Sequence, residues 1–366
     1  MDPNKLRLPS HLRALDGLRG FACLAVVAHH CYFSVGQYTW PLGLPKLFSY
    51  GYLGVEIFFV LSGFCLAYPL LKQPARPDDW ARYARHRVRR IFPPYWAAYL
   101  LFLVLSLLIQ WQQIEPLVQT RLLPVPNLRQ FLYTFPLVAV WFNPAFWTLT
   151  VEARWYATLP FCIKIARKIG VGFLLLLSVL GSAAFAMLEN QLPGRLRFVI
   201  GPLPLFLPLF AMGIALAAFY VRRPMEVPSC LVPANRVALV AVIALLFWQT
   251  PAHPAGDFNF HRIIPGGLLA SSLMLATLYD PFARRLMSAW PLPGIGLFSY
   301  SLYLLHLPLI EICYQLTGSG SWSEWKQFLF YYGFILPACV SLAYAFYLIF
   351  ERPFLRMNRN KMLAPS

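Results

Sequence analysis

Apolar runs long enough to cross a lipid bilayer recur along the whole chain. A membrane-spanning helix needs about 20 largely apolar residues, and ten stretches of the sequence meet this requirement. They lie at 14–34, 50–71, 91–111, 135–163 (with its core at 145–163), 171–188, 201–220, 236–250, 263–280, 293–313 and 329–350. The pattern predicts an all-α fold, a polytopic integral membrane helix bundle with about ten transmembrane helices.

Basic residues are distributed unevenly between the segments that alternate along this topology. If the N-terminus lies in the cytoplasm, the segments on that side hold about three times as many Lys and Arg residues as the opposite side. Cytoplasmic loops of membrane proteins carry such an excess. We therefore expect ten spans with both the N-terminus and the C-terminus in the cytoplasm.

Composition supports the membrane class and accounts for the charge. The 366 residues are 59% hydrophobic and 12% charged, with 31 basic against 14 acidic residues and a net charge of +17. Soluble domains are about 25% charged. The excess of Lys and Arg in cytoplasmic loops explains the positive net charge, so we expect no nucleic-acid partner. The polar start of the chain predicts no cleaved signal peptide, and we expect one membrane domain over 1–366 with no appended soluble domain.

The seven cysteines do not form a recognisable site. They are scattered through mostly apolar stretches without a CxxC or Cys/His cluster, at Cys23, Cys31, Cys65, Cys162, Cys230, Cys313 and Cys339. Isolated buried cysteines behave as small hydrophobic residues. We predict neither structural disulfides nor a metal site.

The first apolar run, RALDGLRGFACLAVVAHH at 13–30, carries ionisable residues at both ends. Arg19 and His30 are eleven residues apart, which on a helix is three turns plus about 20° and a rise of about 16 Å. Both therefore share one stripe of the helix, whereas His29 points about 100° away. Ionisable groups inside a membrane segment are costly and usually functional, so we place Arg19 at the cytoplasmic rim and His30 near the midplane.

Three further ionisable residues lie inside apolar runs at a similar depth. These are Glu56 in GVEIFFVLSGF, Glu152 in FWTLTVEARWYATLP and His306 in FSYSLYLLHLPL. Polar groups from four helices at one level predict an internal cavity. Structural roles stay open for each of them: Glu56 lies near a helix N-terminus, where acids stabilise the helix, and His306 suits helix packing.

A dense basic run precedes the third apolar stretch. RYARHRVRRIFPPYW at 82–96 contains five arginines, including Arg87 and Arg90. Guanidinium groups pair bidentately with phosphate oxygens, which would suit a phosphorylated carrier that extends a reactive arm into the membrane. A positive-inside anchor flanked by interfacial aromatic residues is the structural alternative.

Six motifs in register resemble the acyltransferase-3 membrane family, which includes polysaccharide O-acetyltransferases. LDGLRGFACLAVVAHH resembles its Arg-x10-His helix, and GVEIFFVLSGF, RRIFPPYW, FWTLTVEARWY, SYSLYLLHLPL and the closing ERPF follow in the family's order along nearly the whole chain. The family's second acidic or polar residue after the helix-4 Glu is absent, because Ala153 and Arg154 stand there. This departure bears on acceptor choice or local charge balance.

The resemblance implies a membrane-bound O-acyltransferase of the bacterial cytoplasmic (inner) membrane. An acyl group, most often acetyl, would pass from acetyl-CoA or another acyl-CoA to a hydroxyl of a carbohydrate, glycolipid or secondary-metabolite acceptor. Acyl-CoA would be a co-substrate, and no bound cofactor is expected.

Roles for individual residues follow from that reaction. A neutral imidazole suits the task of deprotonating a hydroxyl, so His30 is the expected general base, with Glu152 or Glu56 as its orienting or charge-balancing partner. Arg19, Arg87 and Arg90 would hold the CoA phosphates. The acceptor side would be lined by His306, Tyr303 and Ser301.

Two other classes of function remain possible at this stage. Intramembrane His and Glu residues also build proton relays, so a multi-pass transporter or channel is the main rival, although no inverted repeat is evident. A non-catalytic assembly subunit is the third. The sequence leaves open the acceptor, the acyl chain length, the oligomeric state and whether an acyl-enzyme forms.

Overall fold

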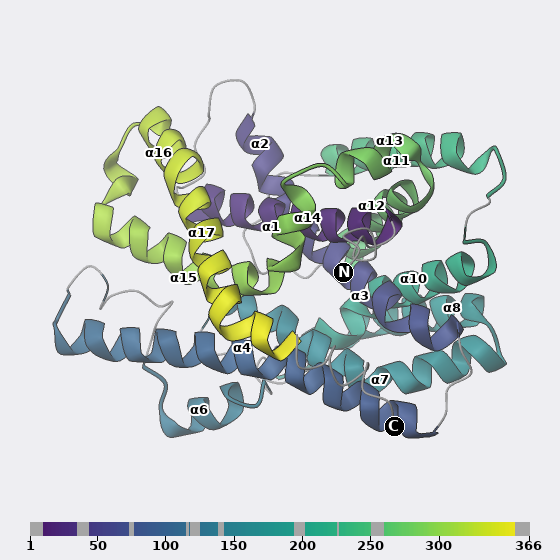
Figure 1. Cartoon of the computed structure of the whole chain (residues 1–366), viewed down its shortest axis with the longest axis horizontal. Helices are drawn as coiled ribbons and strands as arrows, with labels where there is room; N and C mark the ends of the chain where they lie inside the picture. Colours follow the sequence, from purple (N-terminus) through teal and green to yellow (C-terminus); the bar gives the residue numbers. More distant parts are fainter. Residues whose placement is uncertain are drawn as a thin grey trace, which may run out of the picture. The chain divides into compact units, whose positions relative to one another are not determined.

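The computed structural model describes residues 10–34, 44–72, 77–114, 117, 125–137, 143–193, 202–224, 227–249 and 260–355. Within these ranges all regular structure is helical (Figure 1). The all-α prediction is confirmed, and each of the ten predicted stretches coincides with helix over most of its length.

The longer helices carry the labels of Figure 1. They are α1 (Ser10–Ser34), α2 (Leu44–Ser49), α3 (Leu53–Lys72), α4 (Pro77–Trp111), α6 (Leu128–Thr134), α7 (Trp147–Lys168), α8 (Val171–Leu188), α10 (Pro202–Arg222), α11 (Leu231–Gln249), α12 (Phe260–Tyr279), α13 (Pro281–Met287), α14 (Leu292–Leu297), α15 (Ser299–Thr317), α16 (Glu324–Phe330) and α17 (Leu336–Phe346). Short 3-10 turns are η3 (Tyr50–Tyr52), η4 (Pro144–Phe146), η5 (Glu189–Gln191) and η6 (Ser319–Ser321), and η7 (Tyr331–Ile335) and η8 (Tyr347–Glu351) are π-helical.

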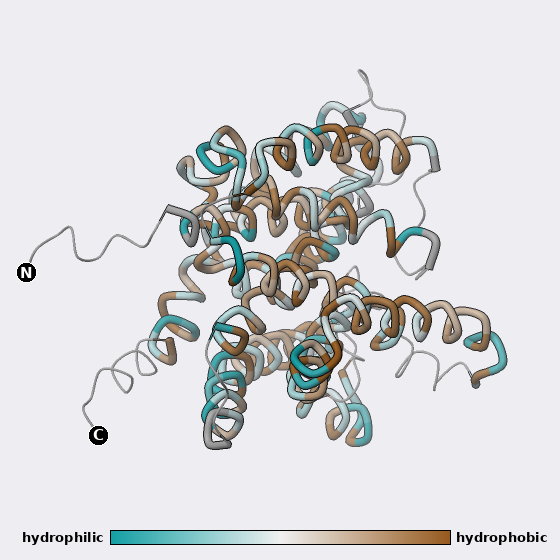
Figure 2. The backbone as a smooth tube through the Cα atoms, turned by 90° about the vertical axis from the view of Figure 1, so that its right-hand side faces the viewer, coloured by the Kyte–Doolittle hydropathy of each residue, from teal (hydrophilic) through white to brown (hydrophobic). Residues whose placement is uncertain are grey.

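Seven helices in the described part of the chain are long and apolar enough to cross a membrane. They are Leu47–Lys72, Trp80–Trp111, Val171–Gln191, Pro202–Arg222, Leu231–Trp248, Arg262–Tyr279 and Glu324–Leu355. Figure 2 shows the hydrophobic stretches along the helices and hydrophilic residues towards many of their ends. The chain is a multi-pass membrane protein.

Three of the ten predicted spans are not among these seven. α1, α7 and α15 have 25, 22 and 19 residues, which is long enough, but polar residues interrupt their apolar surface. The number of crossings therefore stays a prediction. So does the cytoplasmic location of the two ends, since residues 1–9 and 356–366 lie outside the described residues.

Some predicted boundaries differ from the structure. The basic run at 82–90 is itself helical, because α4 begins at Pro77 and continues through Pro93 and Pro94 to Trp111. The predicted helix at 293–313 is broken at Phe298, between α14 and α15. Between the third and fourth predicted spans lies α6, and a reciprocal capping box between Asn127 and Gln130 marks its start. Apolar run length alone does not report these features.

The chain separates into two compact units. Unit 1 comprises 1–24, 52–75 and 157–297, and unit 2 comprises 25–51, 76–156 and 298–366. In unit 1, α3 and α10 approach closely at Gly63 and Gly213, where an added Cβ on Gly63 would overlap the carbonyl oxygen of Phe210. Small residues allow helix backbones to approach in this way inside a membrane.

The motif LDGLRG has a packing role within unit 1. A Cβ on Gly17 would overlap the carbonyl oxygen of Met287, and one on Gly20 would overlap that of Leu292. Glycine at both positions thus lets the start of α1 lie directly against the backbone of the 287–296 segment. Side-chain volume, and not only charge, accounts for this part of the motif.

In unit 2, α15 packs against α17, α4 and η4. Most of its first three turns is buried, including the polar residues Ser301, Tyr303 and His306. A helix with buried polar residues places hydrogen-bonding groups where they must find protein partners or serve chemistry.

Candidate active site

The predicted site residues divide between the two units. His30, Arg87, Arg90, Glu152, Ser301, Tyr303 and His306 belong to unit 2, whereas Arg19 and Glu56 belong to unit 1. α1 is one helix from Ser10 to Ser34, as the spacing argument for Arg19 and His30 requires.

Two histidines that are far apart in sequence meet in unit 2. The Nε2 atom of His306 lies 3.3 Å from the Nδ1 atom of His30, and the ring centroids are 4.9 Å apart at an interplanar angle of 62°. One ring comes from α1 and the other from α15. The sequence placed both at a similar depth but did not indicate that they touch.

Backbone carbonyls determine the donor and acceptor roles in this pair. His30 Nδ1 lies 2.9 Å from the carbonyl oxygen of Val26, and His306 Nδ1 lies 2.8 Å from that of Tyr303. A carbonyl oxygen only accepts hydrogen bonds, so in neutral rings both Nδ1 atoms carry the hydrogen and both Nε2 atoms carry a lone pair. His306 Nε2 is thereby an acceptor for His30.

The two rings differ in exposure. His306 is 0% exposed, whereas His30 is only half-buried. Among the residues that the structure describes, no hydrogen-bond partner is found for His30 Nε2. An accessible imidazole nitrogen with a free lone pair is the chemical requirement for a general base.

Tyr303 and Ser301 have protein partners for their hydroxyl groups. The Tyr303 hydroxyl donates to the carbonyl oxygen of Ala145 at 2.7 Å and accepts from Thr148 at 2.8 Å. Ser301 donates to Glu351 Oε2 at 2.5 Å. These bonds connect α15 to η4, α7 and η8, and the acceptor-side role of the two residues stays a prediction.

Glu351 is a buried carboxylate that we did not assign to the site from sequence. It is 2% exposed and terminates the π-helical segment η8. π-helical segments often occur at functional positions. The available signal was the acidic residue that opens ERPF directly after an apolar run.

Glu152 and Arg87 belong to one cluster in unit 2. Tyr156, one helical turn after Glu152, donates its hydroxyl to Glu152 Oε1 at 2.6 Å. The Arg87 guanidinium lies 5.8 Å from the centre of the Tyr156 ring and 5.5 Å from that of Tyr83. The sequence placed Arg87 at the rim and Glu152 deep in the membrane, but here Tyr156 connects them.

The guanidinium of Arg87 contacts aromatic rings and has no ion-pair partner among the residues that the structure describes. Its Nε atom is buried without a hydrogen-bond partner in the described part of the chain. Cation–π contacts hold the group by its faces, which leaves its N–H edge for other acceptors. Arg90 is half-buried and close enough to interact electrostatically with Tyr156.

Arg19 and Glu56 have their contacts within unit 1. Arg19 donates to Asp16 Oδ1 at 2.8 Å and lies 3.7 Å from Cys65 Sγ. Glu56 is buried in the first turn of α3, and its Oε2 has no hydrogen-bond partner among the described residues. A Cβ on Gly266 would lie 3.0 Å from Glu56 Cγ, so glycine makes room for this carboxyl group. The donor-binding role of Arg19 and the support of His30 by Glu56 stay predictions.

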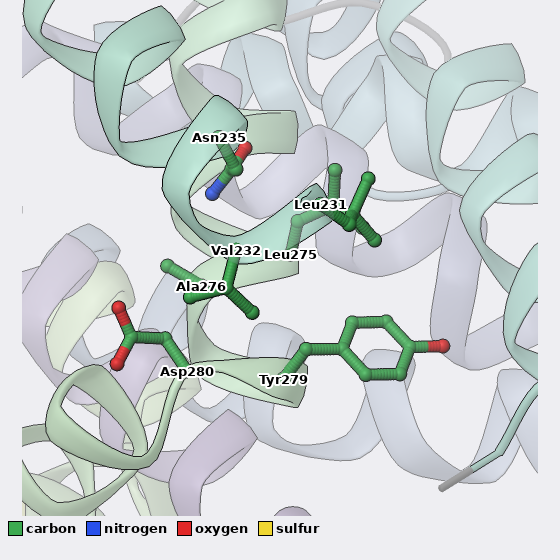
Figure 3. Close-up of a pocket in the computed structure, with 7 residues that line it drawn as sticks. All are labelled: Leu231, Val232, Asn235, Leu275, Ala276, Tyr279 and Asp280. Atoms are coloured by element: carbon green, nitrogen blue, oxygen red, sulfur yellow. The ribbon is translucent and has the colours of Figure 1, made fainter. Parts of the chain in front are cut away.

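A small pocket lies between α11 and α12 in unit 1 (Figure 3). It is lined by Leu231, Val232, Asn235, Leu275, Ala276, Tyr279 and Asp280. Beside it, Arg236 donates to both carboxylate oxygens of Asp280, at 2.7 and 3.0 Å. None of the predicted site residues lines this pocket, and the predicted cavity near His30 stays a prediction.

Comparison with known proteins gives a consistent result. The sequence model of an acyltransferase domain (acyltransferase-3) matches residues 12–347. The chain is 27% identical to the acyltransferase MdmB of Streptomyces mycarofaciens, over 89% of this chain and 85% of that protein. It is 26% identical to the peptidoglycan O-acetyltransferase OatA of Listeria monocytogenes, over 87% of this chain and 52% of that protein.

A third relative is the putative peptidoglycan O-acetyltransferase YrhL of Bacillus subtilis. It is 25% identical over 94% of this chain and 55% of that protein. The chain thus spans about half the length of these two peptidoglycan O-acetyltransferases. No solved structure matches the chain.

Proposed function

The chain belongs to the acyltransferase-3 family, as its motifs predicted, and is a membrane acyltransferase. We propose that it moves an acyl group from acyl-CoA to a hydroxyl group, with His30 as general base. Acetyl is the expected group. One observation carries this assignment: on half-buried His30, Nδ1 lies 2.9 Å from a carbonyl oxygen and 3.3 Å from His306 Nε2, which leaves Nε2 as the nitrogen with the lone pair.

The reaction follows from that lone pair. His30 Nε2 takes the proton of the acceptor hydroxyl while the hydroxyl oxygen forms a bond to the thioester carbonyl carbon. The tetrahedral intermediate then breaks its carbon–sulfur bond, and the departing thiolate takes a proton back from the imidazolium. The products are an ester and free CoA, and His30 returns to its neutral form.

Arg87 supports the use of a phosphorylated donor. Its guanidinium lies beside two tyrosine rings, which restrict its orientation, and its N–H groups would pair with the phosphate oxygens of CoA. Arg90 adds positive charge one turn further along α4. Arg19 would contribute from α1, with its partner Asp16 fixing its side chain.

The names of two relatives support a carbohydrate acceptor. OatA and YrhL are named for peptidoglycan O-acetylation, and MdmB is named only as an acyltransferase. We place the protein in the cytoplasmic membrane of a bacterium, with the donor on the cytoplasmic side.

Purified protein in vesicles with radiolabelled acetyl-CoA provides the test. His30→Ala should abolish label transfer to a hydroxyl acceptor and leave acetyl-CoA binding largely unchanged. Arg87→Ala should raise the dissociation constant of acetyl-CoA first. If wild type and both variants bind acetyl-CoA with equal affinity, Arg87 does not bind the donor. If His30→Ala transfers the label as well as wild type, His30 is not the general base. Vesicles that move a solute but never consume acetyl-CoA would instead support the transporter.

A further inference from the structure

We propose that His306 is a positioning residue for His30: it holds His30 in the tautomer whose Nε2 can accept the hydroxyl proton. The role rests on the function proposed above and differs from the acceptor-side role expected from sequence. The His306 side chain is 0% exposed, so it has no surface with which to contact an acceptor molecule.

His306 is held in place by its own helix. Its Nδ1 lies 2.8 Å from the carbonyl oxygen of Tyr303 and 3.2 Å from that of Leu302, one turn back on α15. Two carbonyl acceptors at one ring nitrogen keep the hydrogen on Nδ1. The lone pair on Nε2 therefore points at His30 Nδ1 at 3.3 Å.

Two hydrogen-bond acceptors therefore lie near the same nitrogen of His30, Nδ1. The Val26 carbonyl oxygen lies 2.9 Å from its Nδ1, and the His306 lone pair lies on the same nitrogen. In the opposite tautomer, the lone pair on His30 Nδ1 would oppose both acceptors. The Nδ1–H tautomer satisfies them together, and it leaves Nε2 unprotonated on the accessible edge of the ring.

The same contact acts during proton transfer. When His30 Nε2 takes the hydroxyl proton, the ring becomes an imidazolium and its Nδ1–H becomes a stronger, charge-assisted donor. His306 accepts that bond and remains neutral, so no proton leaves His30. This is the part played by the third member of nucleophile–base–orienter arrangements, here supplied by an uncharged ring.

Two substitutions at His306 separate positioning from packing. Gln can present an oxygen acceptor near the position of Nε2, whereas Leu fills the space without one. We expect His306→Leu to lower kcat by about 10²-fold, the lower end of what a positioned general base contributes, with KM for acetyl-CoA unchanged. His306→Gln should recover most of kcat. Equal loss in both variants, or a loss expressed in KM, would overturn the assignment.

A matched control removes a different buried hydrogen bond in unit 2. Tyr331 and Ser319 bond through their hydroxyls at 2.8 Å, and Tyr331→Phe should leave kcat unchanged. If Tyr331→Phe lowers kcat as much as His306→Leu, the effect is general loosening and positioning is excluded.

A spectroscopic readout is independent of activity. Solid-state NMR of protein labelled with ¹⁵N-histidine should show His30 protonated at Nδ1 and bare at Nε2 in wild type. In His306→Leu, where only the Val26 carbonyl still favours this tautomer, the share of the Nε2–H tautomer should rise. An unchanged His30 tautomer in His306→Leu would overturn the positioning role even if transfer is confirmed. If the His30 tautomer changes in His306→Leu but the wild-type protein shows no acyl transfer, the contact between the histidines is supported and the proposed function is wrong.

Discussion

Two pairs of helices in this protein differ in which side chains they bury. In α8 and α11 the apolar side chains point outward: only 17% and 6% of their most apolar windows is buried. In α15, by contrast, Ser301 and His306 are fully buried, and α1 presents His30 to His306. Apolar residues on the first pair are exposed, as lipid-facing residues are, and polar residues on the second pair contact protein.

The contrast explains which helices a hydropathy criterion detects. α8 and α11 satisfy it because a lipid-facing helix needs an apolar surface all round. α1, α7 and α15 do not satisfy it, and they carry His30, Glu152 and His306. Three helices with a weak hydropathy signal thus carry His30, Glu152 and His306, whereas the ionisable site residues on α3 and α4 lie on helices that satisfy the criterion.

The largest expected effect comes from making α1 resemble α8. His30→Leu replaces the predicted base with an apolar side chain, so we expect acyl transfer to fall by about 10²- to 10⁴-fold. The melting temperature should fall only modestly, because the buried Nε2 atom of His306 loses its donor, which costs about 1–3 kcal/mol. Transfer assays and thermal melts in detergent measure both quantities. If His30→Leu retains full transfer, the polar residue on α1 is not needed for the reaction.

The reverse change gives α11 a charge. Val240 is 68% exposed near the middle of α11, so Val240→Arg should cost about 2.5–3.5 kcal/mol of insertion free energy. We expect less of the variant to be inserted into membranes, whereas Val240→Leu should behave like wild type. Equal insertion of the Arg variant would mean that this face of α11 does not meet lipid.

Adding a methyl group to a glycine sharpens the comparison within unit 1. Gly63→Ala forces a Cβ into the backbone of α10, and overpacking of this kind costs about 1–3 kcal/mol. At Gly181 on α8, none of the described residues has an atom within 4 Å of the corresponding position, so Gly181→Ala should be neutral or gain about 0.5–1 kcal/mol from helix propensity. Unfolding in mixed SDS micelles measures both, and equal losses would contradict the assigned packing.

The smallest effect concerns the ion pair beside the pocket of unit 1. The hydrogen bond from Arg236 lowers the pKa of Asp280 below its usual 3.8. Because the folded-state pKa is depressed, the stabilisation is complete above the unfolded pKa and is lost as pH falls through the folded value.

Asp280→Asn keeps an oxygen acceptor for the backbone N–H of Phe282 and removes the charge. Its melting temperature should lie slightly below that of wild type at pH 7, and the gap should shrink below about pH 4. A gap that is constant across this range would show that the charge on Asp280 contributes no stability.

Much of the molecule was determined by the sequence alone. Run length and apolar content predicted the all-α membrane fold, because hydrocarbon leaves the backbone few alternatives to helix. The order of motifs predicted the family. The positions of His30, Glu152 and His306 stood out because polar residues are rare inside apolar runs.

Only the tertiary structure decided which of these residues meet. His30 found His306, 276 positions away in sequence, and Glu152 was joined to Arg87 through Tyr156. It also decided that α4 continues through the basic run and that Phe298 interrupts the ninth stretch. Helical periodicity reports direction and depth along one helix, but which faces of different helices touch depends on their packing, which no single segment encodes.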